Sequence, residues 1–353
     1  MPALKKRVFS ILAVFLYLFF FAKKVYAMHI SEGILPFNWA FVWYLVAAPF
    51  LIKGVFDIKT KSKINPSFKP LLGMMGALIF FISCMPVPVP TAGTCSHPAG
   101  TGISAILIGP IMSIFVTSIA LFIQALFLAH GGITTWGADI VSMGIAGSFA
   151  GYIIFKALRK LNFPLFVCGF MAGLLADWAT YITTSFELSS ALHGAKPMFS
   201  LFWAILIAFI PTQLPLGILE GFLTGGVIVF VYKRRPDILT SLGVIRENGR
   251  DVRKSLAKII AILLISLFFC MNNRLAFAEG NPKWGGIDES IVEKVAEEHG
   301  RPAWTPFINT DQGDLLLFVF LLAGAAGGFI MGYNFRRLFA EKKQDASLLK
   351  DAQ

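Results

Sequence analysis

The sequence predicts an all-α, polytopic membrane protein, and three features support this class. The chain of 353 residues is 56% hydrophobic and only 14% charged, which is typical of membrane proteins and not of soluble domains. Long apolar runs recur along it. Lys and Arg gather between these runs, as the positive-inside rule expects for cytoplasmic loops. The net charge of +11 therefore reflects orientation in a lipid bilayer and gives no indication of nucleic acid. The sequence contains no nucleotide-binding loop, no pattern typical of a Ser-His-Asp catalytic triad and no zinc protease motif, so nothing indicates an enzyme.

Residues 1–27 have the three parts of a secretory signal peptide. A basic start precedes an apolar run, Val8 to Ala22, and Val25-Tyr26-Ala27 has small residues at the first and third positions of a cleavage site. The alternative is an uncleaved first transmembrane helix, for which this run is short. Lys23-Lys24, between the run and the cleavage site, is unusual for both interpretations.

Cleavage after Ala27 would make Met28 the mature N-terminus and His29 the second residue. The terminal amine, the deprotonated amide nitrogen of His29 and its near ring nitrogen would then close two small rings around one cation. Three coplanar nitrogens suit a tetragonal ion such as Ni(II) or Cu(II), with Co(II) as a further candidate. Without cleavage, His29 is interpreted as an interfacial histidine with no role in metal binding.

Residues 28–235 are predicted to form a membrane domain of about six or seven helical segments. Trp39 to Ile52 ends before a series of lysines and so crosses inward, and Leu71 to Met85 returns to the outer side. The later spans are Ile140 to Phe155, Phe163 to Thr184, and Phe199 to Tyr232, the last kinked near Pro211 and Pro215.

The stretch from His97 to His130 must contain an even number of crossings if the basic loops are to stay inside. Residues Pro98 to Ala138 contain no Lys, Arg, Asp or Glu, and Gly109-Pro110 interrupts the first half. We therefore predict a broken helical hairpin or a re-entrant piece, which is tolerated at membrane depth only when buried or lining a cavity.

The C-terminal part is predicted to add two transmembrane helices around an acidic external loop, residues 279–313. The loop either concentrates cations before capture or is simply a solvated polar connection. A second cleavage-like sequence, Leu275 to Ala278, leaves open that this part is processed separately. The predicted parts are a basic cytoplasmic linker (236–257), a two-helix domain (258–343, with spans Ile259 to Met271 and Leu315 to Phe335) and a cytoplasmic tail (344–353).

Two further histidines lie near the outer face. His97 is in a loop rich in Gly and Pro, and its imidazole could fill the fourth position of a planar nitrogen site or bond to a neighbouring carbonyl. His130, before Gly131-Gly132, could be a helix-end residue, a partner that orients a ligand, or a transient ligand.

Four acidic residues lie in or near the predicted spans. An ionisable group there is costly unless it is paired or buried in the bundle, so it indicates either a function or a packing role. The sequence does not choose between the two for Asp139, Asp177, Glu187 and Glu220.

Four motifs, in order, closely resemble the CbiM/NikM family, the substrate-binding membrane subunits (S components) of energy-coupling-factor cobalt and nickel importers. The resemblance extends from Met28 to about Tyr232. The C-terminal residues 258–343 resemble a fused CbiN/NikN-type small subunit less strongly. The motifs are Met28-His29-Ile30-x-Glu32-Gly33-x-Leu35-Pro36, Cys95-Ser96-His97-Pro98-x-Gly100-Thr101-Gly102, Gly109-Pro110, and Ala129-His130-Gly131-Gly132-x-Thr134-Thr135-x-Gly137-Ala138.

The resemblance implies an S-component-like bundle that holds the metal on the Met28 amine, the amide and imidazole of His29, and the imidazole of His97. Supporting or transit roles fall by position on Ser96, Thr101, Glu32 and His130. Family members often begin at the Met-His pair itself, so here the site depends on removal of the upstream segment.

The resemblance further implies a multi-pass protein of the cell (inner) membrane with an extracytoplasmic mature N-terminus. Its partners would be a transmembrane coupling (T) subunit and a cytoplasmic ATPase dimer. The transported substrate would be Co(II) or Ni(II), with no catalytic cofactor. Cobalt is favoured because of the Cys-Ser-His-Pro-x-Gly-Thr-Gly loop, and it would supply cobalamin biosynthesis. The alternatives are a nickel importer that supplies nickel enzymes and a membrane metal sensor that transports nothing.

Overall fold

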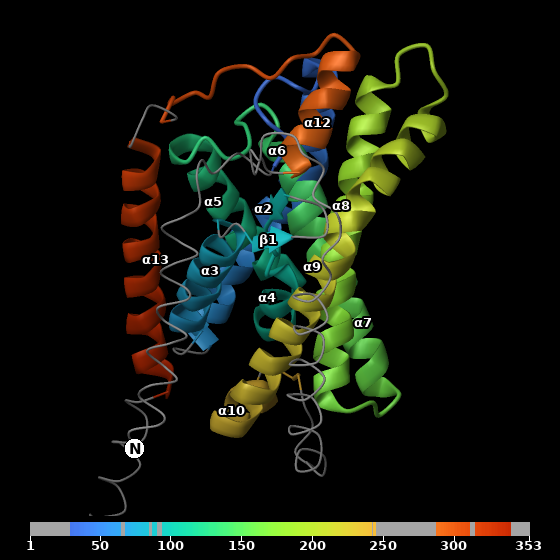
Figure 1. The fold of residues 1–353 in the computed structure, drawn as a ribbon. Coiled ribbons are helices and arrows are strands. Elements are labelled where there is room, and N and C mark those ends of the chain that lie inside the picture. The colour runs from blue at the N-terminus through green and yellow to red at the C-terminus, as the bar shows by residue number, and fades with distance from the viewer. Residues whose placement is uncertain are drawn as a thin grey trace, which may run out of the picture.

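The computed structural model describes residues 29–64, 68–84, 87–89, 94–241, 243–244, 287–310 and 315–339, and within them the chain forms a bundle of helices (Figure 1). The predicted all-α membrane fold is confirmed. The main elements are α2 (Phe37–Ile64), α3 (Phe68–Cys84), β1 (Val87–Val89), β2 (Thr94–Ser96), α4 (Thr101–Ile108), α5 (Pro110–Phe127), α6 (Trp136–Asp139), the π-helix η1 (Ile140–Gly147), α7 (Ser148–Lys160), α8 (Leu165–Leu192), α9 (Met198–Arg234), α10 (Pro236–Ser241), α12 (Ile287–Glu298) and α13 (Leu315–Phe339).

Six helical stretches among the described residues are long and apolar enough to cross a membrane. They are α2, α5, the continuous α6–η1–α7 helix, α8, α9 and α13, and α3 is a shorter apolar helix. The part up to Arg234 therefore has seven helical segments including α3 and α4, as expected. α13 matches the last predicted span, whereas the span Ile259 to Met271 falls outside the described residues.

The segment between His97 and His130 is a broken helical hairpin, as predicted. The eight-residue helix α4 is buried at every position, and α5 begins directly after it at Pro110. Gly109 joins them with φ 87°, in the left-handed region that favours glycine. The two arms are joined across the break by hydroxyl groups, because Ser104 hydrogen-bonds Ser113.

A short antiparallel ribbon precedes this hairpin, with Val87 paired to Ser96. The sequence predicted a loop rich in Gly and Pro before His97 and gave no sign of these two three-residue strands. The ribbon ends one residue before His97 and so fixes where that side chain enters the bundle.

The helix that begins at Trp136 contains a π-helical stretch, η1, before it continues as α7. π-helices are rare and are frequently found at functional sites. This stretch carries Ser142 and Met143 and packs against α8. It begins directly after Asp139, which lies at the end of α6.

Helices α8 and α9 pack closely along glycines. A Cβ atom on Gly169 would lie 2.8 Å from the Cα of Gly225, and one on Gly173 would lie 2.6 Å from the carbonyl oxygen of Glu220. Small residues allow such close approach of membrane helices. This contact places Glu220 of α9 beside the residues that directly precede α4.

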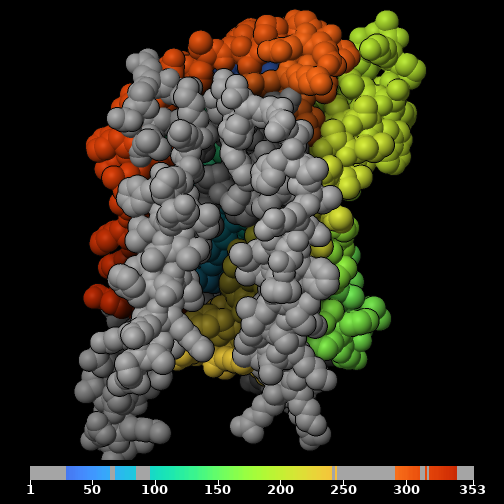
Figure 2. Space-filling view, viewed as in Figure 1, coloured from blue at the N-terminus to red at the C-terminus, as the bar shows by residue number. Residues whose placement is uncertain are grey.

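The acidic segment differs from the expected external loop, because residues 287–298 form helix α12. Its apolar side, with Val292 and Ala296 buried, packs toward α9 and β2. Because many residues of α12 are acidic, the sequence alone did not indicate that the helix has an apolar face. In Figures 1 and 2, the segment that contains α12 lies across one end of the bundle.

Candidate metal centre

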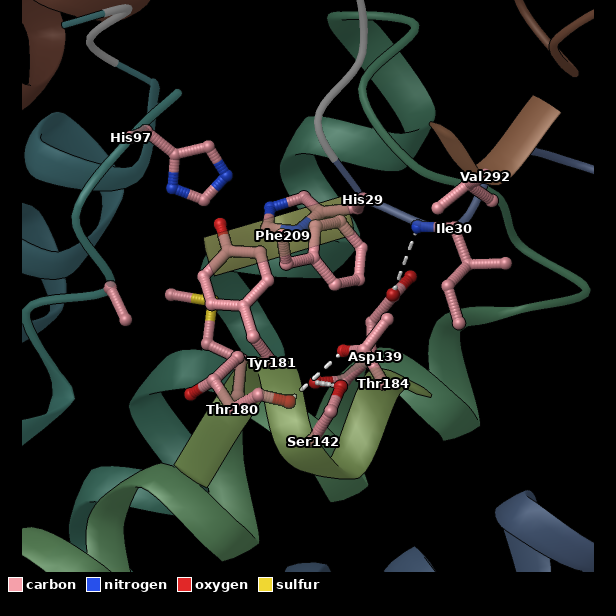
Figure 3. A pocket seen from close by; sticks show the side chains of 12 residues that line it. His29, Ile30, His97, Asp139, Ser142, Thr180, Tyr181, Thr184, Phe209 and Val292 are labelled. Atoms are coloured by element: carbon pink, nitrogen blue, oxygen red, sulfur yellow. Dashed lines mark hydrogen bonds between the residues drawn. The ribbon is translucent and has the colours of Figure 1, made fainter. Parts of the chain in front are cut away.

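Three imidazoles from distant parts of the chain meet inside the bundle, near the end that α12 covers. One ring nitrogen from each of His29, His97 and His130 lies within 4.8 Å of the others. The ring centroids are 4.7 Å apart for His29 and His97, 4.6 Å for His29 and His130, and 5.3 Å for His97 and His130. Figure 3 shows the His29 and His97 rings facing each other across the pocket.

A hydrogen-bond chain fixes the tautomer of His29. Ser83 donates its hydroxyl proton to the Ile79 carbonyl at 2.7 Å, so it accepts from Gln124 Nε2 at 2.6 Å. The other end of the Gln124 amide is then the oxygen, which lies 3.0 Å from His29 Nε2. His29 Nε2 must therefore carry the proton, which leaves Nδ1 with a free lone pair.

His97 also has one free ring nitrogen, which is Nε2, whereas in His29 it is Nδ1. Its Nδ1 lies 3.1 Å from the Pro98 carbonyl, an acceptor only, so Nδ1 carries the proton. Its Nε2 is buried and has no hydrogen-bond partner among the described residues. The backbone after it is held by Glu220, whose carboxylate accepts from Ala99 N at 2.8 Å and Gly100 N at 2.9 Å.

The backbone that presents His130 is strained. Ala129 has φ 49° although it is not a glycine, and Gly131 follows with φ 84°. Neither ring nitrogen of His130 has a hydrogen-bond partner among the described residues, although the ring is fully buried. Two buried, unpaired nitrogens are costly, and a bound cation would satisfy one of them.

Burial keeps all three imidazoles neutral. Desolvation lowers the pKa of His97 to about 4, and it lowers the pKa of His29 and of His130 well below the usual value. The neighbouring imidazoles add to the effect for His29 and His130. Neutral imidazole is the form that binds a metal, so the site need not lose ring protons at neutral pH.

Glu32 holds the N-terminal loop, and it does not point at the imidazoles. Its carboxylate accepts from the backbone N–H groups of Ile133 and of Thr134, the latter at 3.0 Å. On the same loop, the N–H of Ile30 donates to Asp139 Oδ1 at 3.2 Å. These bonds tie the residues after His29 to the loop that carries His130.

Ser96 and Thr101 lie outside the imidazole cluster. The Ser96 hydroxyl accepts from Gln213 Nε2 at 3.0 Å and lies 3.3 Å from the Tyr181 hydroxyl. Thr101 begins α4, deeper in the bundle. Met28 falls outside the described residues, so its amine as a ligand stays a prediction.

Sequence reasoning missed several residues that build this site. Gln124 fixes a tautomer, and its only signal was an amide in the otherwise apolar α5. Arg301 donates to the Gly33 carbonyl at 3.1 Å and to the Leu35 carbonyl at 3.2 Å, so the segment after α12 holds the loop before α2. The N–H of Trp304 also donates to the Glu32 carbonyl at 2.8 Å. No local pattern indicated either contact.

The fold and the imidazole cluster together define a helical membrane protein with a nitrogen-rich site at one end, which is the class of a metal transporter component. Comparison with solved structures agrees. The chain is similar to one described as the crystal structure of a transition metal transporter, with TM-score 0.51 and 26% identity, covering 63% of this chain and 100% of that one. A truncated transition metal transporter also matches with TM-score 0.51 and 26% identity, covering 58% of this chain and 99% of that one.

Sequence comparison identifies the family. The profile of CbiM, described as cobalt uptake substrate-specific transmembrane region, matches residues 29–238. The cobalt transport protein CbiM of Geobacter sulfurreducens is 55% identical over 325 residues, 91% of this chain and 93% of that protein. That of Sorangium cellulosum is 52% identical over 219 residues, 62% of this chain and 97% of that protein. The chain belongs to the CbiM family.

Proposed function

We propose that this chain is the substrate-binding subunit of an energy-coupling-factor importer that captures Co(II) at the extracytoplasmic face. The single observation that carries the proposal is the pair of free nitrogens, His29 Nδ1 and His97 Nε2. They complete a four-nitrogen site when the amine of Met28 and the amide nitrogen of His29 are added.

The tautomer of His29 supports a chelate made by its own backbone. Nδ1 is the ring nitrogen nearer the main chain, and with the His29 amide nitrogen it closes one small ring around a cation. The amine of Met28 closes the second ring. Because Gln124 holds the far nitrogen, Nε2, the near one is the nitrogen left for the metal.

The proposal requires cleavage after Ala27. The chelate needs a free amine on Met28, since that amine offers a lone pair and ends the chain two small rings away from the His29 imidazole, whereas a peptide nitrogen binds only after it loses its proton. The mature N-terminus would then lie outside the cell membrane beside His97 and His130.

Import would depend on partners. The sequence has no nucleotide-binding loop, so ATP hydrolysis is assigned to a separate ATPase dimer and its coupling to a transmembrane subunit. The C-terminal residues 258–343 would act as a fused CbiN/NikN-like subunit. The relatives support a separable module, because the Sorangium protein is matched almost completely by 219 residues of this chain.

Nickel is the second candidate substrate, and the chemistry of the site favours it. A site of four nitrogens binds Ni(II) more tightly than Co(II) under the Irving–Williams order. The names of the relatives support cobalt, and cobalamin biosynthesis would be its destination.

The decisive experiment is uptake of radiolabelled Co(II) and Ni(II) by cells that express the chain with its partner subunits, alongside N-terminal sequencing. We expect ATP-dependent uptake and a mature chain that starts at Met28. A matched variant carries two Ala residues inserted between Ala27 and Met28, with the cut still after Ala27, because a single inserted residue would leave an amine-x-x-His sequence that can itself bind a cation through four nitrogens. It should lose high-affinity binding because the Met28 amine becomes a peptide nitrogen. Full affinity in this variant, or in a chain that keeps residues 1–27, would overturn the proposal.

A further inference from the structure

The pocket beneath the imidazoles is lined by ring nitrogens at one end and by oxygen atoms further into the bundle. His29 and His97 form one end of its lining. The other end lies between the start of η1 and the middle of α8, where the lining includes Asp139, Ser142 and Thr184 (Figure 3). No lysine or arginine is among the described residues that line it.

The hydroxyl groups of this lower part offer lone pairs to the cavity. Ser142 donates its proton to the Ala138 carbonyl at 3.1 Å, and Thr180 donates to the Ala176 carbonyl at 3.0 Å. Thr184 likewise donates to the Thr180 carbonyl at 3.1 Å. A hydroxyl has one proton, so each of these oxygens is left as an acceptor. Hydroxyl oxygens that present lone pairs to a cavity can bind a cation there.

Two carboxyl groups border the same region. Glu187 is not part of the pocket lining, but it lies seven residues after Thr180 on α8, hence on the same face, and it is close enough to Asp139 for the two carboxyl groups to interact. Glu187 is fully buried, and neither of its oxygens has a partner within hydrogen-bond distance among the described residues, although the Ser142 hydroxyl interacts with it more weakly. With no basic residue in the adjoining pocket, a buried acid pair is neutralised either by protons or by a cation that replaces them.

We propose that this lower region is a second station for the transported divalent cation, on the inward side of the imidazoles. Its ligands would be the carboxyl oxygens of Glu187 and Asp139 with the hydroxyl oxygens of Ser142 and Thr184. This inference rests on the proposed function and adds a route to it. An oxygen site holds Co(II) or Ni(II) less tightly than nitrogen ligands do, so the ion would pass from tight capture to weaker binding.

Polar groups continue deeper into the bundle from this station. A Cβ atom on Gly147 would lie 2.7 Å from Thr101 Oγ1 and 2.9 Å from Thr180 Oγ1, so the two hydroxyls meet at this glycine. Next to it, Ser148 donates to Ser113 at 2.8 Å beside the broken hairpin. Thr101, whose sequence motif predicted a supporting role, would lie on this route and not at the capture site.

The test uses Mn(II), an ion that prefers oxygen ligands and can be followed by electron paramagnetic resonance. The purified mature chain, which starts at Met28, is first given one equivalent of Co(II) to fill the nitrogen site and is then titrated with Mn(II). The variants are Glu187→Gln and Thr184→Val. The matched control is Thr183→Val, because Thr183 donates to the Ala179 carbonyl at 2.8 Å in the same way but does not line the pocket.

We expect the natural chain and Thr183→Val to bind one Mn(II) beyond the Co(II) equivalent. Glu187→Gln should weaken that second equivalent by about 10-fold or more, and Thr184→Val by less, while both keep the first. A natural chain that binds Co(II) but no Mn(II) would overturn the second station alone. Equal Mn(II) binding in Glu187→Gln, or loss of both equivalents there, would also overturn it. A natural chain without the first equivalent would instead contradict the proposed function.

Discussion

Glu220 and Glu187 are both completely buried, yet their surroundings are opposite. Glu220, on α9, is saturated by the N–H groups of Ala99 and Gly100 beside His97. Glu187, on α8, has no partner within hydrogen-bond distance among the described residues. A satisfied carboxylate fixes a shape, whereas an unsatisfied one is available for a ligand. The difference distinguishes the proposed capture region around the imidazoles, where the carboxylate is hydrogen-bonded, from the proposed oxygen region beneath them, where it is not.

The largest effect on this comparison should come from His97→Ala, which removes a nitrogen of the capture region. We expect the Kd for the first Co(II) equivalent to rise by about 100-fold or more, because disturbing residues that only support a metal ligand already costs 10–100-fold. The Mn(II) equivalent should remain. Isothermal titration with both ions measures this, and an unchanged Co(II) affinity would restrict His97 to a structural role.

A reciprocal pair of substitutions should separate the two regions. Glu220→Gln replaces a carboxylate that accepts two N–H groups with an amide whose nitrogen cannot accept, and hydrogen bonds to charged groups contribute about 1.5–3 kcal/mol. We expect about 10-fold weaker Co(II) capture and little change in Mn(II) binding. Glu187→Gln should do the reverse. If Glu220→Gln and Glu187→Gln changed Co(II) and Mn(II) binding in the same way, the two regions would not be separate.

Gln124→Leu should give a smaller loss confined to the capture region. Without the amide oxygen, the His29 proton is free to move to Nδ1, the nitrogen proposed to bind the metal. We expect Co(II) affinity to fall by about 10-fold, the lower end of the range for a residue that orients a ligand. Nitrogen NMR of the His29 ring checks the cause, since the natural tautomer retained in the variant would contradict it.

The smallest effect is on the pH dependence of stability without metal. His97 has a pKa of about 4 in the folded chain against 6.5 in an unfolded one. Between these values the unfolded chain binds more protons, so stability should fall as pH drops from 6.5 towards 4. His97→Asn should make the thermal midpoint, followed in detergent, less sensitive over this window. Identical slopes would exclude His97 as a source of acid sensitivity.

The bundle could be predicted from the sequence because each span depends on local composition and on the charges that flank it. The broken hairpin at Gly109-Pro110 was predicted for the same reason, through the parity of crossings. The convergence of His130 on His29 could not be predicted, because it depends on a strained turn at Ala129 and on packing between distant segments. The π-helical stretch was also missed, since an apolar run without charges does not reveal how many residues make one turn.

The contacts of the segment after α12 have a consequence for chain integrity. Arg301 binds backbone carbonyls of residues 33–35, and α13 packs against α3. These interactions join the two ends of the polypeptide without using the residues between α10 and α12. If a protease cut after Ala278, these contacts would still connect the two fragments, and we expect the same contacts to form between the two parts if separate genes encoded them.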